Sequence, residues 1–281
     1  MPERVDRSSK TKSRRGTRAA DRREGAAVVA VGRQDPKFSQ SLERGLAILA
    51  CFTVERSLLG IAEMADQLGL SRSTTHRYAT TLVELGYLEQ EDDRKYRLGL
   101  RVTDLGSSAL SGTGLREHAR PHLQKLRSET TMACGLSVLD GGEIVYLERL
   151  RPQNASSAEL SAPLAPGSRL PAHTTAAGKL LLASISEEER ERALKQAPGL
   201  TAKGRRELAS ELDQIAESGI ARNDDGTSHA LAVGVRENGG EVLAAVNLVA
   251  THQDGSGART IEDYRPRLEA AAQRISAQLG R

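Results

Sequence analysis

The chain has only two cysteines and no long apolar run, and each shortage excludes a class of protein. Cys51 and Cys134 lie far apart in the sequence, so they predict neither a disulfide scaffold nor a Cys-x-x-Cys metal or redox motif. No segment approaches the roughly 18 consecutive apolar residues of a membrane-spanning helix, and the charged N-terminus lacks the apolar core of a signal peptide. We therefore expect a cytoplasmic protein in a reducing compartment, without membrane contact.

Catalytic and metal-binding motifs are also missing. The sequence contains no Gly-x-Ser-x-Gly elbow, no His-Glu-x-x-His pair and no phosphate-binding loop. Its 6 histidines are scattered and do not show the spacing of metal ligands. These absences favour a binding protein over an enzyme, with no cofactor and no metal.

Length and charge distribution predict at least two domains and a separate tail. The 281 residues, 38% of them hydrophobic, exceed the usual domain size of about 100–200 residues. Residues 1–37 contain 11 Lys and Arg against 5 Asp and Glu, whereas the remaining 244 contain 29 against 32. We expect this basic tail to be disordered. It is either an arm attracted to DNA phosphates or a solvated leader, and the second interpretation is favoured.

A short helix, a tight turn and a longer helix are expected between residues 61 and 85. Apolar spacing predicts a helix from Ile61 to Leu68, and Gly69 fits the left-handed residue that ends a helix. Ser71 is a preferred N-cap for the next helix. This order is typical of a helix-turn-helix, whose second helix enters the major groove of DNA.

The two faces of this second, longer helix differ in chemistry. At 100° per residue, one arc collects the side chains that we expect to be buried, which are Thr75, Tyr78, Ala79, Leu82 and Leu85. The opposite arc holds donors and short hydroxyls without a carboxylate, namely Arg72, Ser73, His76, Arg77 and Thr80. We predict that this arc contacts phosphates and base edges, together with Ser71 and Thr74 at the helix start.

An amphipathic helix and a β-hairpin are expected on either side of these helices. Residues 39–53 carry an apolar stripe at helical spacing, formed by Leu42, Leu46 and Leu49 and widened by Ile48 and Phe52. After the longer helix, the segment 86–90, an acidic turn and the segment 95–98 predict a hairpin in which Tyr96 and Leu98 alternate with basic residues. Such a hairpin is a wing, and we expect its DNA contacts from Arg94, Lys95 and Arg97.

Several segments resemble the IclR family of bacterial transcription regulators. They are Phe38–Leu49, Leu70–Arg77 and Thr81–Tyr87, followed by Arg120–Leu126, Val138–Gly142, Ile144–Tyr146, Gly167–Pro171 and Ala177–Lys179. The resemblance covers about residues 38–280. It implies an α+β chain in which a winged helix-turn-helix is joined by a linker helix to a GAF- or profilin-like antiparallel sheet domain. It also implies a double-stranded DNA operator, a small organic or aromatic acid as effector, and dimers or tetramers of the chain.

The downstream sequence supports such a sheet domain on its own. Two hairpins are expected, from Cys134–Leu139 with Glu143–Leu150 and from Ala230–Arg236 with Val242–Ala250. Helices are expected near 120–130, 174–184, 187–196, 204–218 and 261–279. The resulting division is a tail (1–37), a winged helix-turn-helix (38–100), a linker helix broken near Gly112 and Gly114 (101–118), and an effector-binding domain (119–281).

Candidate effector-binding residues fall in three places. The helix start formed by His173, Thr174, Thr175, Ala176 and Ala177 combines backbone N–H groups, a positive dipole end and small side chains, which suits a carboxylate. Alternatively, Thr174 is only an N-cap and the alanines pack on the sheet. Asp224 and His229 line a pocket or belong to an ordinary Asp-Gly turn. Asn247 stands among apolar neighbours on a strand and needs a partner, which is a ligand, a backbone group or water.

These observations predict a DNA-binding transcriptional regulator whose C-terminal domain senses a small, carboxylate-bearing metabolite. Two rivals remain, an architectural DNA-binding protein and an enzyme acting on the bound small molecule. We expect at least a dimer, with Leu105, Ala109 and Leu110 offering a helix face that a second copy covers. The alternative is that this face packs on the chain's own sensor domain.

Overall fold

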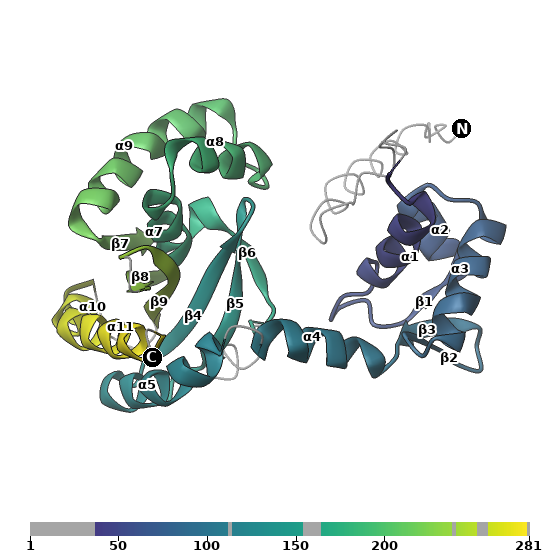
Figure 1. Ribbon diagram of the computed structural model, residues 1–281, viewed down its shortest axis with the longest axis horizontal. Helices are drawn as coiled ribbons and strands as arrows, with labels where there is room; N and C mark the ends of the chain where they lie inside the picture. Colours follow the sequence, from purple (N-terminus) through teal and green to yellow (C-terminus); the bar gives the residue numbers. More distant parts are fainter. Residues whose placement is uncertain (1–36, 112–113, 154–163, 238–239, 252–257, 280–281) are drawn as a thin grey trace, which may run out of the picture. The chain divides into compact units, whose positions relative to one another are not determined.

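The computed structural model divides the chain into two compact units, residues 1–102 and 103–281 (Figure 1). The structure describes residues 37–111, 114–153, 164–237, 240–251 and 258–279. Apart from Lys37, the basic tail lies outside the described residues, so its expected disorder stays a prediction. Among the described residues, no helix is long and apolar enough to cross a membrane.

The first unit is a winged helix-turn-helix. Its elements are α1 (Gln40–Ala50), β1 (Leu59–Gly60), α2 (Ile61–Leu68), α3 (Arg72–Glu84), β2 (Leu88–Gln90) and β3 (Lys95–Leu98), and the strands form a sheet in the order β1-β3-β2. The local signals act as predicted, because Gly69 adopts a φ of 65° and the Ser71 hydroxyl accepts the Thr74 N–H. The two-residue strand β1 was not predicted.

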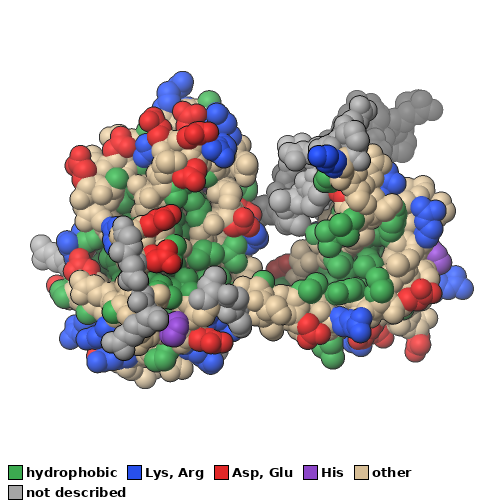
Figure 2. All heavy atoms as spheres, viewed as in Figure 1, with side chains coloured by type: hydrophobic (Ala, Val, Ile, Leu, Met, Phe, Trp, Pro, Cys, Tyr) green, Lys and Arg blue, Asp and Glu red, His purple; other side chains and the backbone are tan. Residues whose placement is uncertain are grey.

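Only part of the apolar stripe expected on α1 is buried. Leu42 and Leu46, on the predicted apolar stripe, are 64% and 56% exposed, whereas Ala47 and Ile48 are buried. Glu43, although charged, is also buried. Contacts with α2 and α3 fix which face turns inward, so Ile48 and Leu49 of the expected stripe join the core while Leu42 and Leu46 face outward. Figure 2 shows hydrophobic side chains gathered over this helix.

Two further side chains of the first unit differ from expectation. Leu85 and Leu98 were expected in the core but are 48% and 38% exposed. Both lie at the end of their element, since α3 ends at Glu84 and β3 ends at Leu98. The periodic patterns therefore fail where regular structure stops.

The second unit is a six-stranded antiparallel sheet with helices on both faces (Figure 1). The strand order within the described residues is β6-β5-β4-β9-β8-β7. The strands are β4 (Ala133–Asp140), β5 (Glu143–Leu150), β6 (Arg169–Pro171), β7 (Ile220–Asp224), β8 (Ser228–Arg236) and β9 (Val242–Thr251). Both predicted hairpins are present, whereas the short edge strands β6 and β7 were not predicted.

The helices sort into two layers that bury two separate apolar clusters. One cluster lies under α5 (Leu115–Thr130), α10 (Ala258–Asp263) and α11 (Arg265–Leu279). The other lies under α7 (Ala176–Ser184), α8 (Glu187–Gln196) and α9 (Ala202–Ser218), after the short 3-10 helix η1 (Ala172–Thr174). The sheet is thus covered on both faces, as in GAF- and profilin-like domains.

Two helices of this unit depart from the expected bounds. The helix α4 (Arg101–Ser111) ends before the glycine-containing joint, and α5 already begins at Leu115. Pro121 therefore sits inside α5 rather than in its first turn. The expected final helix is two helices, because the chain leaves α10 after Asp263 and restarts at Arg265 beside Pro266, whose ring fits a first helical turn.

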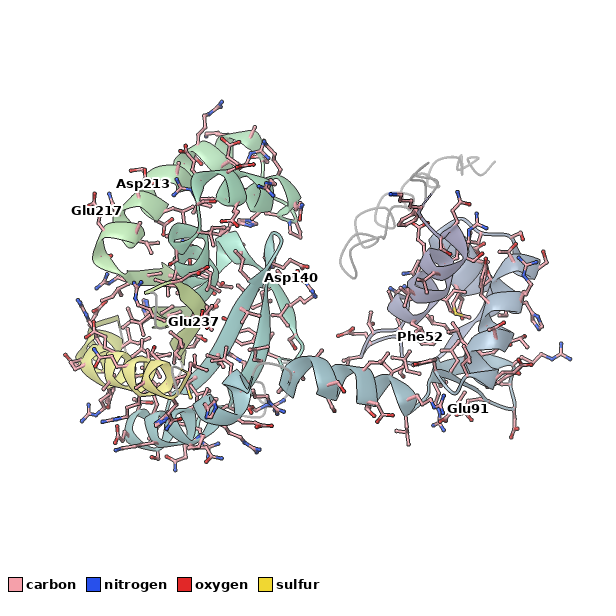
Figure 3. All side chains as sticks on the ribbon, in the orientation of Figure 1. Phe52, Glu91, Asp140, Asp213, Glu217 and Glu237 are labelled. Carbon is pink, nitrogen blue, oxygen red and sulfur yellow. The ribbon has the colours of Figure 1, made fainter. Side chains whose placement is uncertain are left out.

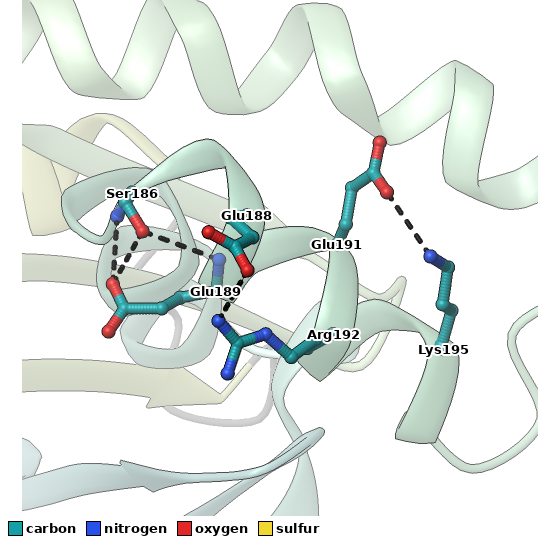
Figure 4. Close-up of polar contacts among 6 residues, drawn as sticks. All are labelled: Ser186, Glu188, Glu189, Glu191, Arg192 and Lys195. Atoms are coloured by element: carbon teal, nitrogen blue, oxygen red, sulfur yellow. Dashed lines mark hydrogen bonds and ion pairs between the residues drawn. The ribbon is translucent and has the colours of Figure 1, made fainter.

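A capping box defines the start of α8, and ion pairs link side chains along its exposed side (Figure 4). The Ser186 hydroxyl accepts the Glu189 N–H at 3.3 Å, and the Glu189 carboxylate accepts the Ser186 N–H at 3.2 Å. This reciprocal capping box satisfies two N–H groups at the helix start. Ion pairs one turn apart, between Arg192 and Glu188 and between Lys195 and Glu191, add a few tenths of a kcal/mol each, about 0.3–0.5.

Candidate functional site

The start of α3 is built from hydroxyl groups. Ser71 Oγ accepts the Thr74 N–H at 3.1 Å, lies 2.8 Å from Thr74 Oγ1 and lies 3.0 Å from Ser73 Oγ. Serine and threonine are suited to this position because their hydroxyls replace the missing intrahelical partners. The cluster is exposed at the positive end of the helix dipole, which favours phosphate oxygens nearby.

The outward face of α3 is a set of exposed, uncompensated donors. Arg72, Ser73, His76, Arg77 and Thr80 are all exposed, while Thr75, Ala79 and Leu82 on the inner side are buried. In the described part of the chain, no carboxylate lies within 4.0 Å of the Arg72 or Arg77 guanidinium. The Arg77 guanidinium lies over the Tyr78 ring, 5.6 Å from its centroid. The face predicted to contact DNA is therefore fully presented to solvent.

The wing is less cationic in three dimensions than its sequence suggests. Arg97 contacts Glu89 at 2.5 Å and Glu91 at 3.1 Å, and these carboxylates, Glu89 foremost, raise the pKa of Arg97. Lys95 lies 3.8 Å from Asp93. Glu91 sits at the turn of the hairpin (Figure 3).

Arg94 is the wing cation with the fewest competing charges. It occupies the hairpin turn with a φ of 60°, and its side chain has no carboxylate within 4.0 Å among the described residues. Of the three predicted wing contacts, Arg94 is therefore the one whose charge is fully available to a phosphate.

The start of α7 is closed by close backbone packing. Its N-cap is Thr175, whose hydroxyl accepts the Gly178 N–H at 2.9 Å, while Thr174 is exposed and donates to the Pro171 carbonyl. Ala176 and Ala177 are 2% and 1% exposed and belong to the apolar cluster of this face. The small side chains at this helix start thus pack on the sheet.

His173 precedes this helix with a buried, unpartnered Nδ1 atom. Burial lowers the pKa of His173, and the charge of Lys179 lowers it further. Both effects favour the neutral imidazole, in which one ring nitrogen donates and the other accepts a hydrogen bond.

Asp224 and His229 meet at the edge of the sheet, as partners across β7 and β8. The Asp224 carboxylate lies 3.2 Å from His229 Nδ1, beside a cavity of about 410 Å³. The other charges of this cavity also pair, Lys179 with Glu211 at 2.8 Å and Arg222 with Glu262. Three carboxylates, of Glu211, Asp224 and Glu262, stand against the two cations of Lys179 and Arg222, so the cavity offers little net attraction to an anion.

Asn247 lies at the centre of the sheet on the face covered by α7. It is 2% exposed, pairs with Gly135 on β4 and Ala232 on β8, and its Oδ1 has no hydrogen-bond partner among the described residues. The backbone partner allowed by the sequence analysis is therefore not present in the described structure. Within the same residues, no group of three His, Cys, Asp or Glu side chains could hold a metal ion.

Sequence reasoning did not single out the neighbours of Asn247 on this face. A register shift between Leu136 and Ser137 places Tyr146 opposite Ser137 and Arg149 opposite Gly135. Such a bulge changes which side chains share a face. The period-2 pattern of β5 gives no sign of it, so no sequence signal pointed to these residues.

A winged helix-turn-helix with an exposed cationic helix, followed by a helix-covered sheet domain with buried unpartnered polar groups, defines a DNA-binding regulator with a sensor domain. Comparisons with known proteins identify the family. The model of the IclR helix-turn-helix domain matches residues 41–92, and the model of the bacterial transcriptional regulator IclR C-terminal domain matches residues 107–277. The chain belongs to the IclR family of bacterial transcriptional regulators.

Individual relatives are similar in sequence to this chain over most of its length. The HTH-type transcriptional regulator XynR of Escherichia coli (strain K12) is 32% identical over 86% of this chain and 97% of its own length. The Pca regulon regulatory protein of Pseudomonas putida is 32% identical over 87% and 86%. The structure of an IclR homolog from Microbacterium hydrocarbonoxydans, complexed with 4-hydroxybenzoate, is 29% identical, covers 85% of this chain and 98% of that one, and has a TM-score of 0.69. These relatives are named as regulators, not as enzymes.

Proposed function

We propose that this regulator reads a specific operator with the outward face of α3 and adjusts its affinity in response to a small carboxylate-bearing metabolite. The observation that carries the DNA-reading part is the exposed, carboxylate-free face of α3. Bacterial DNA lies in the cytoplasm, so we expect the protein to act there. The units of this function are the winged helix-turn-helix of residues 38–100, the linker 101–118 and the effector-binding domain 119–281.

The two arginines of α3 have different places and therefore different expected roles. Arg72 is the first residue of the helix and Arg77 lies in its middle. A bidentate Arg–guanine pair discriminates against other bases by about 1–3 kcal/mol, whereas a phosphate contact weakens all sequences alike. Ser71, Ser73, Thr74 and His76 complete the contact surface, with Arg94 ahead of Lys95 and Arg97 on the wing.

The proposed effector is an organic acid bound on the α7 side of the sheet. A homologue is complexed with 4-hydroxybenzoate, and this supports an acid of similar size. The candidate contacts are those of the sequence analysis, His173, Thr174, Thr175, Ala176, Ala177, Asp224, His229 and Asn247. Regulation requires that the acid bind operator-competent and incompetent states differently, typically by about 1–3 kcal/mol.

We further propose that the chain acts as a homodimer or a larger assembly. Leu42 and Leu46 on α1 are more than half exposed, and so is Leu105 on α4. Leu110, by contrast, packs against the core of the second unit. For that residue alone, this favours the alternative in which the helix face packs on the chain's own sensor domain. A second copy covering the exposed leucines would remove apolar surface from water and align two reading helices on a repeated operator.

The DNA-reading proposal is tested by selecting binding sites from a random duplex library and measuring affinities by gel shift over a salt series. The variants are Arg72→Ala and Arg77→Ala, with Arg97→Ala as a matched control, because its charge is paired with two glutamates. We expect losses of about 5- to 150-fold per α3 arginine on each half-site, and at most a few-fold for Arg97→Ala. Unchanged affinity in both α3 variants would remove this helix as the reader.

The same experiments discriminate the rivals. Failure to select any consensus, with equal affinity for specific and random DNA, would indicate an architectural protein. A thermal-shift screen over organic acids, followed by operator binding with each hit, tests the effector. Chemical conversion of a stabilising acid by the protein alone would indicate an enzyme. Light scattering and footprinting test the assembly, and a monomer that protects one isolated half-site would contradict the dimer.

A further inference from the structure

Tyr78 lies where the start of α1 meets the middle of α3. Its ring packs against the apolar core of the first unit, and the Ser41 hydroxyl of α1 donates a hydrogen bond to its oxygen. At about 100° per residue, Tyr78 falls at the border between the buried and outward arcs of α3, on the side of Arg77. His76 and Thr80 occupy the centre of the outward arc. The first turn of α1 therefore flanks the face that we propose reads DNA.

Two arginine side chains meet at the Tyr78 hydroxyl. The Arg77 guanidinium lies over the Tyr78 ring, and both it and the Arg44 side chain of α1 hydrogen-bond to the hydroxyl. In the described part of the chain, no carboxylate lies within 4.0 Å of either guanidinium, and the Arg44 Nε atom is buried without a hydrogen-bond partner. Two cations that share one neutral acceptor repel each other, so this arrangement favours an anion at the same place.

The surroundings of the Tyr78 hydroxyl stabilise negative charge. Hydrogen bonding to Ser41 above all, and to the two guanidiniums, lowers the pKa of Tyr78. The first turn of α1, where the Ser39 hydroxyl accepts the Leu42 N–H, adds the positive end of a helix dipole. Arginine side chains, hydroxyl groups and helix starts are the groups with which proteins hold the phosphates of DNA. The chemistry of the site therefore fits a phosphate group.

We propose that Ser41, Arg44, Arg77 and Tyr78 bind one phosphate of the operator backbone beside each reading helix. The Arg44 and Arg77 guanidiniums pair with the phosphate oxygens, and the Tyr78 hydroxyl holds both guanidiniums in place. Base recognition is then left to other residues of α3, with Arg72 at the helix start foremost. The inference rests on the proposed reading of DNA by α3. It adds a contact from α1 that fixes the position of the helix on the duplex.

Single phosphate replacements in a selected operator test the site directly. An uncharged methylphosphonate is placed at each backbone position of one half-site in turn, and the affinity of the full chain is measured by gel shift. At one position, the replacement should weaken binding of the wild type about tenfold, as expected for a charge-assisted contact. The same replacement should have almost no effect on Arg44→Gln or Arg77→Gln, because the charge that it would remove has already lost its partner.

Affinity and specificity should separate in the same variants. Arg44→Gln and Arg77→Gln should weaken the operator and a random duplex by equal factors, and should reduce the slope of log Kd against log salt concentration by about one for each half-site bound. Arg72→Ala should instead lower the ratio between operator and random affinity. Tyr78→Phe removes no charge, so it should weaken binding a few-fold and leave the salt slope unchanged.

Two control variants separate the phosphate contact from folding and from net charge. Arg44→Lys keeps the charge and should keep the salt slope, and it carries the comparison if Arg44→Gln melts below the wild type. Arg192→Gln removes an exposed cation from α8 in the second unit, so it should alter neither the affinity nor the slope. The methylphosphonate scan of the wild type needs no variant at all.

Three outcomes would overturn the inference. The first is a lower ratio between operator and random affinity in Arg44→Gln, which would assign this residue to base reading. The second is a scan in which no methylphosphonate position depends on Arg44. The third is protection against melting by inorganic phosphate that Arg44→Gln abolishes while DNA affinity stays unchanged, which would make the ligand a free phosphate. The proposed operator reading survives each of them if Arg72→Ala still lowers the ratio, and it fails only if no operator can be selected.

Discussion

Replacing Gly178 with alanine should force η1 away from the start of α7. A Cβ at this position would lie 2.1 Å from the Ala172 carbonyl oxygen and 2.4 Å from its Cα. Both atoms belong to backbone, which cannot move aside as a flexible side chain can. Ordinary contacts of a Cβ begin at 3.4 Å, so the two segments must separate by about 1 Å.

The magnitude follows from comparing two opposing effects of the same methyl group. In an unobstructed helix interior, Gly→Ala stabilises by about 0.5–1 kcal/mol, because alanine loses less backbone entropy on folding. Overpacking a well-filled core costs about 1–3 kcal/mol and more where backbone must shift. For Gly178→Ala, taking the upper end of this cost because backbone must shift, we expect a net loss of about 2 kcal/mol. Gly45→Ala is the matched control, since a Cβ at Gly45 in α1 meets nothing within 4 Å, and it should gain up to about 1 kcal/mol.

Urea unfolding followed by far-UV circular dichroism gives both free energies, and hydrogen exchange locates the change within η1 and α7. The refuting result would be a Gly178→Ala protein as stable as the wild type. That outcome would mean that a gap exists between η1 and the helix start. The first interpretation of the sequence analysis, in which a ligand approaches the α7 N-terminus directly, would then be favoured over the alternative that Ala176 and Ala177 pack on the sheet.

The remaining predictions concern ionisable groups. Four hydrogen bonds from the following Thr and Ser lower the pKa of Asp225 to about 2. Because this pKa is depressed on folding, its stabilisation is present above about pH 4 and is lost as the pH falls towards 2. After discounting for exposure, Asp225→Asn should cost about 1 kcal/mol at pH 7 by urea unfolding, and a constant difference down to pH 2 would contradict this. Burial raises the pKa of Cys51 to about 11 and that of Cys134 to about 12, so iodoacetamide at pH 8 should label neither in the native protein and both after denaturation, as counted by mass spectrometry. Glu148→Gln should cost about 1–3 kcal/mol, because the buried carboxylate faces two arginines, whereas Arg120→Ala, at an exposed partner, should cost less than about 1 kcal/mol.

The helix-turn-helix could be predicted because its signals are local. Gly69 needs a positive φ, and Ser71 needs only the N–H three residues ahead. The hairpin turn before Glu143 is equally local, with Gly141 at a φ of 60°. Signals of this kind act within one turn of chain, so the sequence around them is sufficient.

The orientation of α1 could not be predicted, because it depends on partners far away in the sequence. An apolar stripe indicates that a helix face is removed from water, but it does not say what covers it. In α1 the part of the stripe with Leu42 and Leu46 faces outward, while Ile48 and the charged Glu43 are buried. The sequence pattern predicts that these two leucines are buried, whereas in a single copy of the chain they are exposed. They form part of the surface that we propose a second copy covers.

The candidate ligand site could be predicted only in part, because its residues are brought together by contacts between distant parts of the sequence. Asn247 is recognisable from the sequence as a polar residue within an apolar strand, and in the structure it is buried with no hydrogen-bond partner for Oδ1 among the described residues. Arg149 and Ser137 share its surroundings only through strand pairing and the bulge in β4–β5. Neither the strand pairing nor the bulge produces a periodic pattern in the sequence, so these residues could be identified only from the fold.

The pairing of charges explains why DNA reading is assigned mainly to α3 rather than to the wing. Both elements look basic in sequence, but Arg97 of the wing is held between Glu89 and Glu91. To contact a phosphate it must leave these carboxylates or bring them towards the DNA backbone, and both alternatives reduce the gain from the contact. Arg72 and Arg77 have no such competition within the described residues. The positive charge available to DNA is therefore concentrated on the helix that we propose reads the bases, and this proposal predicts that affinity and specificity both depend on this helix.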